Sequence, residues 1–179
     1  MVRRVAQGSA VALVLGLLAL LVWKVAHQQT SKLPEQVAQD EKPLAPLWTR
    51  KRVDTSGTLS LASLRGKVVV VNFWQSYCAP CTQEARTLAQ TARRWAPKGV
   101  VFVGIDEQDL RSAALKFVHR FGITYPIVAD DLALTGPYGV TGYPETFFID
   151  RHGRVVPPHI VGPATAKTLA EGIERALAE

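Results

Sequence analysis

The sequence is poor in cysteine, shows no internal repeat and carries no net charge over most of its length. Its 179 residues include only two cysteines, which excludes a disulfide framework that staples distant segments. No pattern recurs with a period of about 20 to 50 residues, so a repeat array is excluded. Residues 68–179 hold eleven basic and eleven acidic side chains. The net charge of +6 therefore lies elsewhere, and a broad nucleic-acid surface on the main domain is not expected.

What the chain does contain is typical of one globular domain with an appendage. Apolar residues make up 47% of it and charged residues 20%, unlike a disordered tail, a collagen or a multispan membrane protein. The basic excess is +2 over residues 1–43 and +4 over residues 44–67. Its densest part, Arg50-Lys51-Arg52, is shorter than the polybasic clusters that bind lipid, so we favour a solvated surface over lipid contact.

An apolar run from Val5 to Trp23 follows Arg3 and Arg4 near the start of the chain. As a helix, its 19 residues would extend roughly 28 Å, close to the hydrocarbon thickness of a bilayer. The following residues, Lys24-Val25-Ala26, fit a signal-cleavage site poorly because a lysine stands where a small residue is needed. We therefore predict an uncleaved anchor rather than a cleaved signal, with the basic N-terminus in the cytoplasm and the rest of the chain outside it.

The region after the anchor predicts a tether and then a folded domain. Residues 27–43 (HQQTSKLPEQVAQDEKP) are polar, with two prolines and no sustained apolar period. We therefore divide the chain into three parts. They are a cytoplasmic stub with a transmembrane anchor over residues 1–26, a polar linker over residues 27–43 and the folded domain over residues 44–179.

The folded domain alternates between predicted strands and helices. Residues 68–74 (VVVVNFW) predict a strand buried on both faces, with Phe73 and Trp74 in the core. A helix capped by Asp109 is expected to end at Gly122. The other expected elements are a helix over 80–95, a strand over 100–105, a short strand over 127–129, a helical turn over 132–138, a hairpin of 146–149 and 155–161, and a helix over 165–178. This order predicts an α/β sandwich in which parallel strands give way to an antiparallel pair.

The two cysteines, Cys78 and Cys81, are spaced C-x-x-C between the strand at 68–74 and the helix at 80–95. A disulfide across two residues closes a small loop and adds little stability, so the pair is better explained by reactivity. At the start of a helix, free N–H groups and the helix dipole favour the thiolate of Cys78. The thiolate is the attacking species in disulfide exchange, and Cys81 would resolve the mixed disulfide.

Three other uses of a C-x-x-C pair are less consistent with the sequence. A zinc site needs about four ligands, and the four histidines are scattered without ligand spacing. Covalent haem attachment needs a histidine after the second cysteine, where Thr82 stands. An inert structural pair is disfavoured by its place before a helix. We therefore predict no metal, and no cofactor other than a redox-active disulfide of Cys78 and Cys81.

Two further segments are informative together: VVVVNFW with QSYCAPC at 68–81, and GVTGYPETFFID at 139–150. The first resembles the active-site segment of the thioredoxin family, and the second resembles that family's cis-proline loop and following strand. With the N-terminal anchor and LRGK at 64–67, the chain most resembles the TlpA/ResA/CcmG (DsbE) group of membrane-anchored bacterial thiol–disulfide oxidoreductases. The resemblance implies a thioredoxin-like sandwich, with a mixed central sheet flanked by helices, over about residues 45–178. It also implies that a single transmembrane helix holds this domain on the periplasmic side of the bacterial cytoplasmic (inner) membrane.

The resemblance also assigns roles to individual residues. Cys78 would be the nucleophile and Cys81 the resolving thiol. Pro144 would be the cis-proline, and the backbone of Tyr143 would bind an extended substrate segment. Tyr77 stands where the family usually has Trp, so an aromatic side chain still precedes the nucleophile on the substrate-binding side.

Glu84 matches the acidic position of the group's C-x-x-C-x-x-E pattern. Three residues after Cys81, it shares a helix face with that cysteine, so its charge could raise the thiol pKa and its carboxyl could carry a proton. The plainer alternative is an acid that the helix dipole stabilises in the first turn. Asn72 stands where thioredoxins carry a buried Asp, which leaves Glu84 as the remaining proton acceptor. Glu145 follows Pro144 where many thioredoxins have Thr. The resulting Pro-Glu-Thr sequence resembles the cytochrome c maturation members more closely.

The predicted function is reduction of disulfides in exported proteins, with apocytochrome c as a candidate substrate. A membrane thiol carrier would donate the electrons, and residues 5–23 would lie in the lipid bilayer. An oxidase that donates disulfides would use the same pair in the opposite direction. A non-catalytic anchored binding module would keep the shape alone. A peroxidase of the peroxiredoxin type is less consistent, because its T-x-x-C motif is absent and Gln75 stands three residues before Cys78.

Overall fold

The computed structural model describes residues 14–23 and 31–179. The chain divides into two compact units, residues 1–30 and residues 31–179. In the first unit, the described residues 14–23 are helical and exposed. No helix within the described ranges is both long and apolar enough to cross a membrane. The predicted anchor, residues 5–23, lies partly outside the described residues and stays a prediction.

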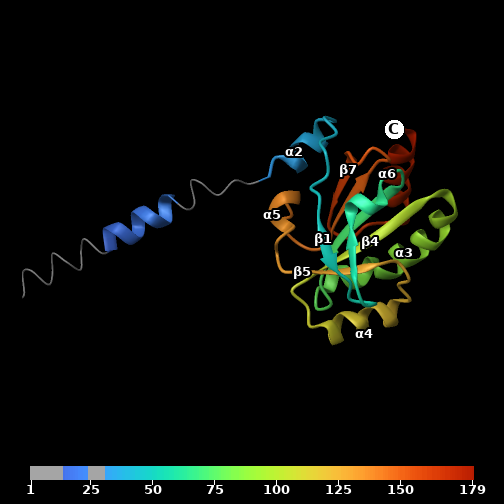
Figure 1. The fold of residues 1–179 in the computed structure, drawn as a ribbon, viewed down its shortest axis with the longest axis horizontal. Helices are drawn as coiled ribbons and strands as arrows, with labels where there is room; N and C mark the ends of the chain where they lie inside the picture. Colours follow the sequence, from blue (N-terminus) through green and yellow to red (C-terminus); the bar gives the residue numbers. More distant parts are fainter. Residues whose placement is uncertain (1–13, 24–30) are drawn as a thin grey trace, which may run out of the picture. The chain divides into compact units, whose positions relative to one another are not determined.

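A five-stranded mixed sheet forms the centre of the second unit (Figure 1). Its strands lie in the order β5-β4-β3-β6-β7. β3 pairs in parallel with β4, and β4 with β5, whereas β6 is antiparallel to both β3 and β7. The strands are β3 (Val68–Trp74), β4 (Val100–Glu107), β5 (Ile127–Asp130), β6 (Glu145–Ile149) and β7 (Val155–Val161). The predicted change from parallel strands to an antiparallel hairpin is therefore confirmed.

Both faces of the sheet are covered, and all seven residues of β3 are buried. Because successive strand side chains point to opposite faces, Val70 and Trp74 pack in one core cluster and Val71 and Phe73 in the other. The first cluster includes residues of α3 (Ala79–Trp95), α4 (Arg111–Phe121) and α6 (Ala166–Ala178), and the second includes residues of α2 (Leu33–Ala38) and α5 (Thr135–Tyr138). The remaining elements are β1 (Thr49–Lys51), β2 (Thr58–Ser60), η1 (Leu61–Leu64) and η2 (Ala96–Lys98). The predicted strand buried on both faces is thus confirmed.

The start of α4 differs from the sequence prediction, although its end agrees with it. The helix ends at Gly122, whose φ of 64° is left-handed. At its start the N-cap residue is Leu110 rather than Asp109. The Asp109 carboxylate instead accepts hydrogen bonds from the backbone N–H of Ser76 at 2.6 Å and from its hydroxyl at 3.0 Å. Ser76 follows β3 and Asp109 follows β4, so pairing of these parallel strands brings the two loops together and overrides the local cap.

The predicted polar linker, residues 27–43, differs from the structure over most of its length. α2 lies within it, and Leu33 and Val37 are buried in the second core cluster. The hydroxyl of Ser31 donates to the carbonyl of Pro137 at 2.7 Å, and the carbonyl of Pro43 accepts from the N–H of Val155 at 2.7 Å. Residues 31–43 therefore belong to the folded unit, and residues 27–30 lie outside the described part. The sequence did not predict that this segment is folded, because only two apolar side chains of α2 pack in the core.

The basic run at residues 50–52 is largely neutralised within the folded unit. Arg50 Nε lies 2.5 Å from Asp130 Oδ1, and Arg52 forms an ion pair with Asp54. Lys51 between them is exposed. Pairing of two of these three charges fits a solvated surface better than a lipid-binding patch.

Candidate active site

The cysteine pair lies where β3 passes into α3. Cys78 is the N-cap residue of α3, and its sulfur accepts a hydrogen bond from the backbone N–H of Cys81 at 3.1 Å. The two cysteines form a disulfide. Cys81 is 1% exposed, whereas Cys78 is half-buried. A helix N-terminus favours a thiolate at Cys78, and the difference in exposure makes Cys78 the sulfur that an outside molecule can reach.

A second segment, residues 141–144, meets the disulfide from the other side of β3. β6 begins at Glu145, which pairs with Phe73 near the end of β3. The loop before it is therefore held at the same edge of the sheet as Cys78. The Tyr143–Pro144 peptide bond is cis, and the Tyr143 carbonyl oxygen lies 3.5 Å from the Cys78 sulfur. The structure thus brings together four of the residues singled out in the sequence: Cys78, Cys81, Tyr143 and Pro144.

The two tyrosines of this region differ in their surroundings. Tyr77 is 68% exposed, directly before Cys78 in the chain. Tyr143 is partly buried, and burial together with the nearby Glu107 and Tyr77 raises the pKa of its phenol to about 12. Tyr77 is therefore free to contact a partner through its ring, whereas Tyr143 presents its carbonyl to the disulfide.

Glu84 lies in the core, 1% exposed, on the face of α3 that also buries Cys81. Its Oε1 accepts a hydrogen bond from Asn72 Nδ2 at 2.8 Å, and its Oε2 accepts one from the N–H of Ala164 at 2.6 Å. Asn72 Nδ2 also donates to Thr146 Oγ1 at 3.0 Å. Burial raises the pKa of Glu84 to about 7, although both hydrogen bonds act to lower it. This is an interior carboxyl that titrates near neutrality, unlike an exposed acid that only complements the helix dipole.

A second group of acids lies near the cysteine loop and was not predicted from the sequence as part of the site. Asp109 holds Ser76, two residues before Cys78, through both of its carboxylate oxygens. Asp106, at the end of β4, is 2% exposed, and its pKa is raised to about 9 by burial, by a hydrogen bond to Asp109 and by the charges of Asp109 and Glu107. Their position in the sequence could have predicted this. Parallel strands end at the same edge of a sheet, so acids at the end of a strand parallel to β3 lie beside the loop that follows β3.

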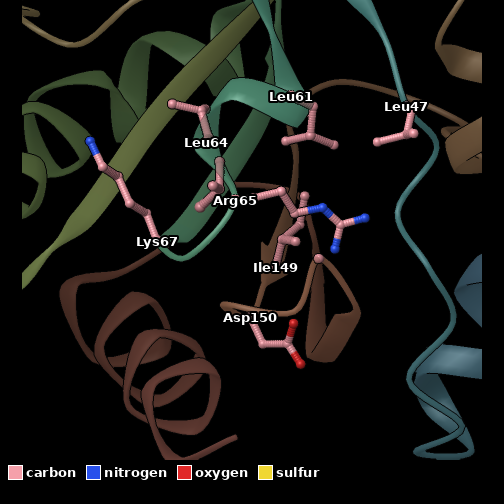
Figure 2. A pocket seen from close by; sticks show the side chains of 9 residues that line it. Leu47, Leu61, Leu64, Arg65, Lys67, Ile149 and Asp150 are labelled. Carbon is pink, nitrogen blue, oxygen red and sulfur yellow. The ribbon is translucent and has the colours of Figure 1, made fainter.

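The pocket in Figure 2 lies away from the disulfide and is too small to be a substrate site. Its lining includes Leu61, Leu64, Arg65, Lys67 and Ile149, so it lies at the end of the sheet where β3 begins. Its volume is about 10 Å³. A cavity of that size holds at most about one water molecule. The Arg65 guanidinium packs against Gly153 and donates to the carbonyl of His152, which ties η1 to the β6–β7 turn.

Within residues 14–23 and 31–179, no group of three or more His, Cys, Asp or Glu side chains is arranged to hold a metal ion. The prediction of a site without metal or other cofactor stays a prediction.

A comparison with protein families matches residues 43–157 to the AhpC/TSA family. The chain belongs to this family. Among its relatives, the thiol-disulfide oxidoreductase ResA of Bacillus thuringiensis (strain Al Hakam) is 33% identical over 112 residues, which cover 62% of this chain and 64% of ResA. The thiol:disulfide interchange protein DsbE of Pseudomonas fluorescens biotype C is 35% identical over 139 residues, which cover 76% of this chain and 74% of DsbE.

A solved structure of a family relative agrees with the fold. The thiol:disulfide interchange protein, thioredoxin family protein from Chlorobium tepidum TLS has 31% identity and a TM-score of 0.68, over 75% of this chain and 96% of that one. The thioredoxin-like α/β fold, with a mixed sheet and flanking helices, is therefore confirmed. The names of these relatives describe thiol-disulfide oxidoreductases and interchange proteins, which is the enzyme class predicted from the sequence. The chain spans slightly less than two thirds of the ResA sequence, at 64%.

Proposed function

We propose that this protein is a thiol–disulfide oxidoreductase that reduces disulfides in exported proteins through Cys78 and Cys81. The observation that carries the proposal is the disulfide at the N-terminus of α3, in contact with the carbonyl of Tyr143 beside the cis Pro144. An extended segment of substrate would lie along Tyr143 and Pro144 through backbone hydrogen bonds, with Tyr77 beside it. The electrons would be carried by the cysteine pair itself, with no further cofactor.

The proposed reaction transfers two electrons in two exchange steps. The Cys78 thiolate attacks one sulfur of the substrate disulfide, and the other substrate sulfur leaves as a thiolate. The Cys81 thiolate then attacks the Cys78 sulfur of this mixed disulfide. The Cys78–Cys81 disulfide forms, and the second substrate sulfur leaves as a thiolate. The half-buried position of Cys78 and the burial of Cys81 support this order of attack.

Glu84 is proposed to take the proton that Cys81 must lose before its attack. A carboxyl with a pKa of about 7 can accept a proton and release it again near neutral pH. The carboxyl and Cys81 lie one helical turn apart on the buried face of α3. The negative charge of Glu84 would also oppose a thiolate nearby, and destabilising the thiolate makes a cysteine pair more reducing. This is the reason for proposing a reductase rather than an oxidase.

We further propose that the protein works at the bacterial cytoplasmic membrane, facing the periplasm. The apolar run from Val5 to Trp23, with Arg3 and Arg4 before it, supports a single-pass anchor whose N-terminus is cytoplasmic. A membrane thiol carrier would supply electrons, and apocytochrome c is the candidate substrate. The 35% identity to DsbE and the 33% identity to ResA support disulfides as the substrate class.

The proposal is tested by trapping partners in membranes with Cys81→Ala. This variant lacks the resolving thiol, so Cys78 should remain joined to its substrate and electron donor as mixed disulfides that can be isolated and identified. The matched control is the double variant Cys78→Ser, Cys81→Ala, which should trap nothing. Absence of any Cys78-linked partner would contradict the enzymatic proposal. A measured reduction potential of about −120 mV lies at the strongly oxidising end of the scale and would contradict the proposal that the protein acts as a reductase.

A further inference from the structure

The loop that carries Tyr143 is held from behind by the carboxylate of Glu145. Glu145 is fully buried, and its Oε1 accepts hydrogen bonds from the N–H of Thr141 at 2.8 Å, the Thr141 hydroxyl at 3.0 Å and the N–H of Gly142 at 3.0 Å. These three donors come from the two residues directly before Tyr143. The backbone on that side of the Tyr143 carbonyl is therefore fixed by one oxygen atom.

The second oxygen of this carboxylate is held by His159 of β7. His159 Nε2 lies 2.7 Å from Glu145 Oε2, and the imidazole stacks on Phe147 with ring centroids 4.2 Å apart and planes 14° apart. The β6–β7 register shifts between Thr146 and Phe148. Stacking on Phe147 fixes the plane of the imidazole, so the edge that carries Nε2 faces the Glu145 carboxylate.

This pair is separate from the Glu84 network, although both meet at β6. Glu145 and Thr146 are neighbours in the strand, so their side chains point to opposite faces of the sheet. Thr146 joins Asn72 and Glu84 on the face covered by α3. Glu145 and His159 lie on the other face and hold the loop. Burial by itself would raise the pKa of Glu145, but the hydrogen bonds from His159 and Thr141 and the charge of His159 keep that pKa below its ordinary value.

We propose that Glu145 and His159 are positioning residues that hold residues 141–143 in the conformation that binds an extended substrate segment. The inference rests on the proposed function, in which the Tyr143 backbone pairs with substrate. Neither side chain is proposed to touch the reacting sulfur atoms. A loop already ordered before binding does not pay its ordering entropy when the substrate arrives, so the pair increases affinity for extended chains rather than the reactivity of Cys78.

The experiment compares two probes that share one reactive disulfide. The first is N-acetylcysteine amide joined to thionitrobenzoate, and the second carries the same mixed disulfide in the middle of a short extended peptide. Attack of Cys78 on the cysteine sulfur releases coloured thionitrobenzoate from both, so the ratio of the two rate constants reports backbone recognition alone. The pre-reduced full chain is measured in detergent micelles as wild type, His159→Ala and Glu145→Gln. His119→Ala, an exposed histidine of α4, is the matched control.

Wild type is expected to react faster with the peptide probe than with the short probe. In His159→Ala and in Glu145→Gln this ratio should fall about tenfold, the change that about 1.4 kcal/mol produces at 25 °C. His119→Ala should keep the wild-type ratio. His159→Gln, which keeps an N–H donor, should recover most of the lost preference.

Thr141→Ala is an alternative variant if the substitutions at the buried pair unfold the protein. Thr141 is exposed, and this substitution removes only one of the three hydrogen-bond donors to Glu145. Its peptide preference should fall two- to threefold, whereas Thr124→Ala, another exposed threonine, should not change it. A wild type without peptide preference, or folded variants that retain it in full, would overturn the positioning role. A wild type that releases thionitrobenzoate from neither probe would instead contradict the proposed function.

Discussion

Replacing Glu84 by Gln should remove a specific part of the pH dependence of stability. Burial raises the pKa of Glu84 from its ordinary value of 4.5 to about 7 in the folded protein. Between these two pH values the folded state keeps a proton that the unfolded chain has lost. The free energy of unfolding of the wild type should therefore fall as the pH rises from about 4.5 to about 7, and this contribution should then stay level. At about 1.4 kcal/mol per pKa unit, the fall is about 3 kcal/mol.

The assay is urea unfolding of the oxidised protein across this pH range, with wild type and Glu84→Gln measured side by side. The disulfide-bonded cysteines do not titrate, and the four histidines are present in both proteins, so their contribution cancels in the difference. Asp106 and Glu107 also have raised pKa values, of about 9 and about 7, but they are present in both proteins and cancel in the difference. Glu171→Gln, on the exposed face of α6, is the matched control and should keep the wild-type slope.

The expected result is a difference between the wild type and Glu84→Gln that changes by about 3 kcal/mol between pH 4.5 and pH 7, with the wild type losing stability. If the two proteins show the same pH slope, Glu84 does not hold its proton to neutral pH. The proposal that it exchanges a proton with Cys81 would then lose its physical basis.

Two further predictions concern packing and capping around α6, both read from urea unfolding. A Cβ at Gly172 would lie 2.4 Å from the ring of Phe148, so Gly172→Ala should destabilise the protein by about 1–3 kcal/mol despite the better helix propensity of alanine. Gly136→Ala, where nothing lies within 4 Å, is the control, and equal stability changes in the two variants would contradict the packing argument. Thr165 caps α6 by accepting from the N–H of Thr168 at 3.1 Å, so Thr165→Ala should cost about 1 kcal/mol. A change below a few tenths of a kcal/mol would show that this cap does not contribute.

The local features of the fold were predictable because they depend on residues close together in the chain. The VVVVNFW run has no polar face, and only a strand covered on both sides can bury it, as β3 is. The helix ends at Gly122, whose backbone takes a left-handed conformation that glycine adopts without strain. The position of Cys78 at the first turn of α3 follows from the same local order of strand, C-x-x-C and helix.

The contacts that complete the site join residues far apart in the chain, and only the tertiary structure decided them. The sequence alone predicted that Asp109 caps a helix. Strand pairing instead brings Ser76 close enough to donate hydrogen bonds to the Asp109 carboxylate. From the sequence, Glu145 was only a difference from other thioredoxins. The pairing of β6 with β7 places His159 beside its carboxylate. Secondary-structure propensity depends on residues within about one helical turn of each other in the sequence. A contact between strands depends instead on sheet topology and strand register. The sequence therefore determined which sulfur chemistry to expect, and the packing of the sheet decided which side chains surround the sulfur atoms.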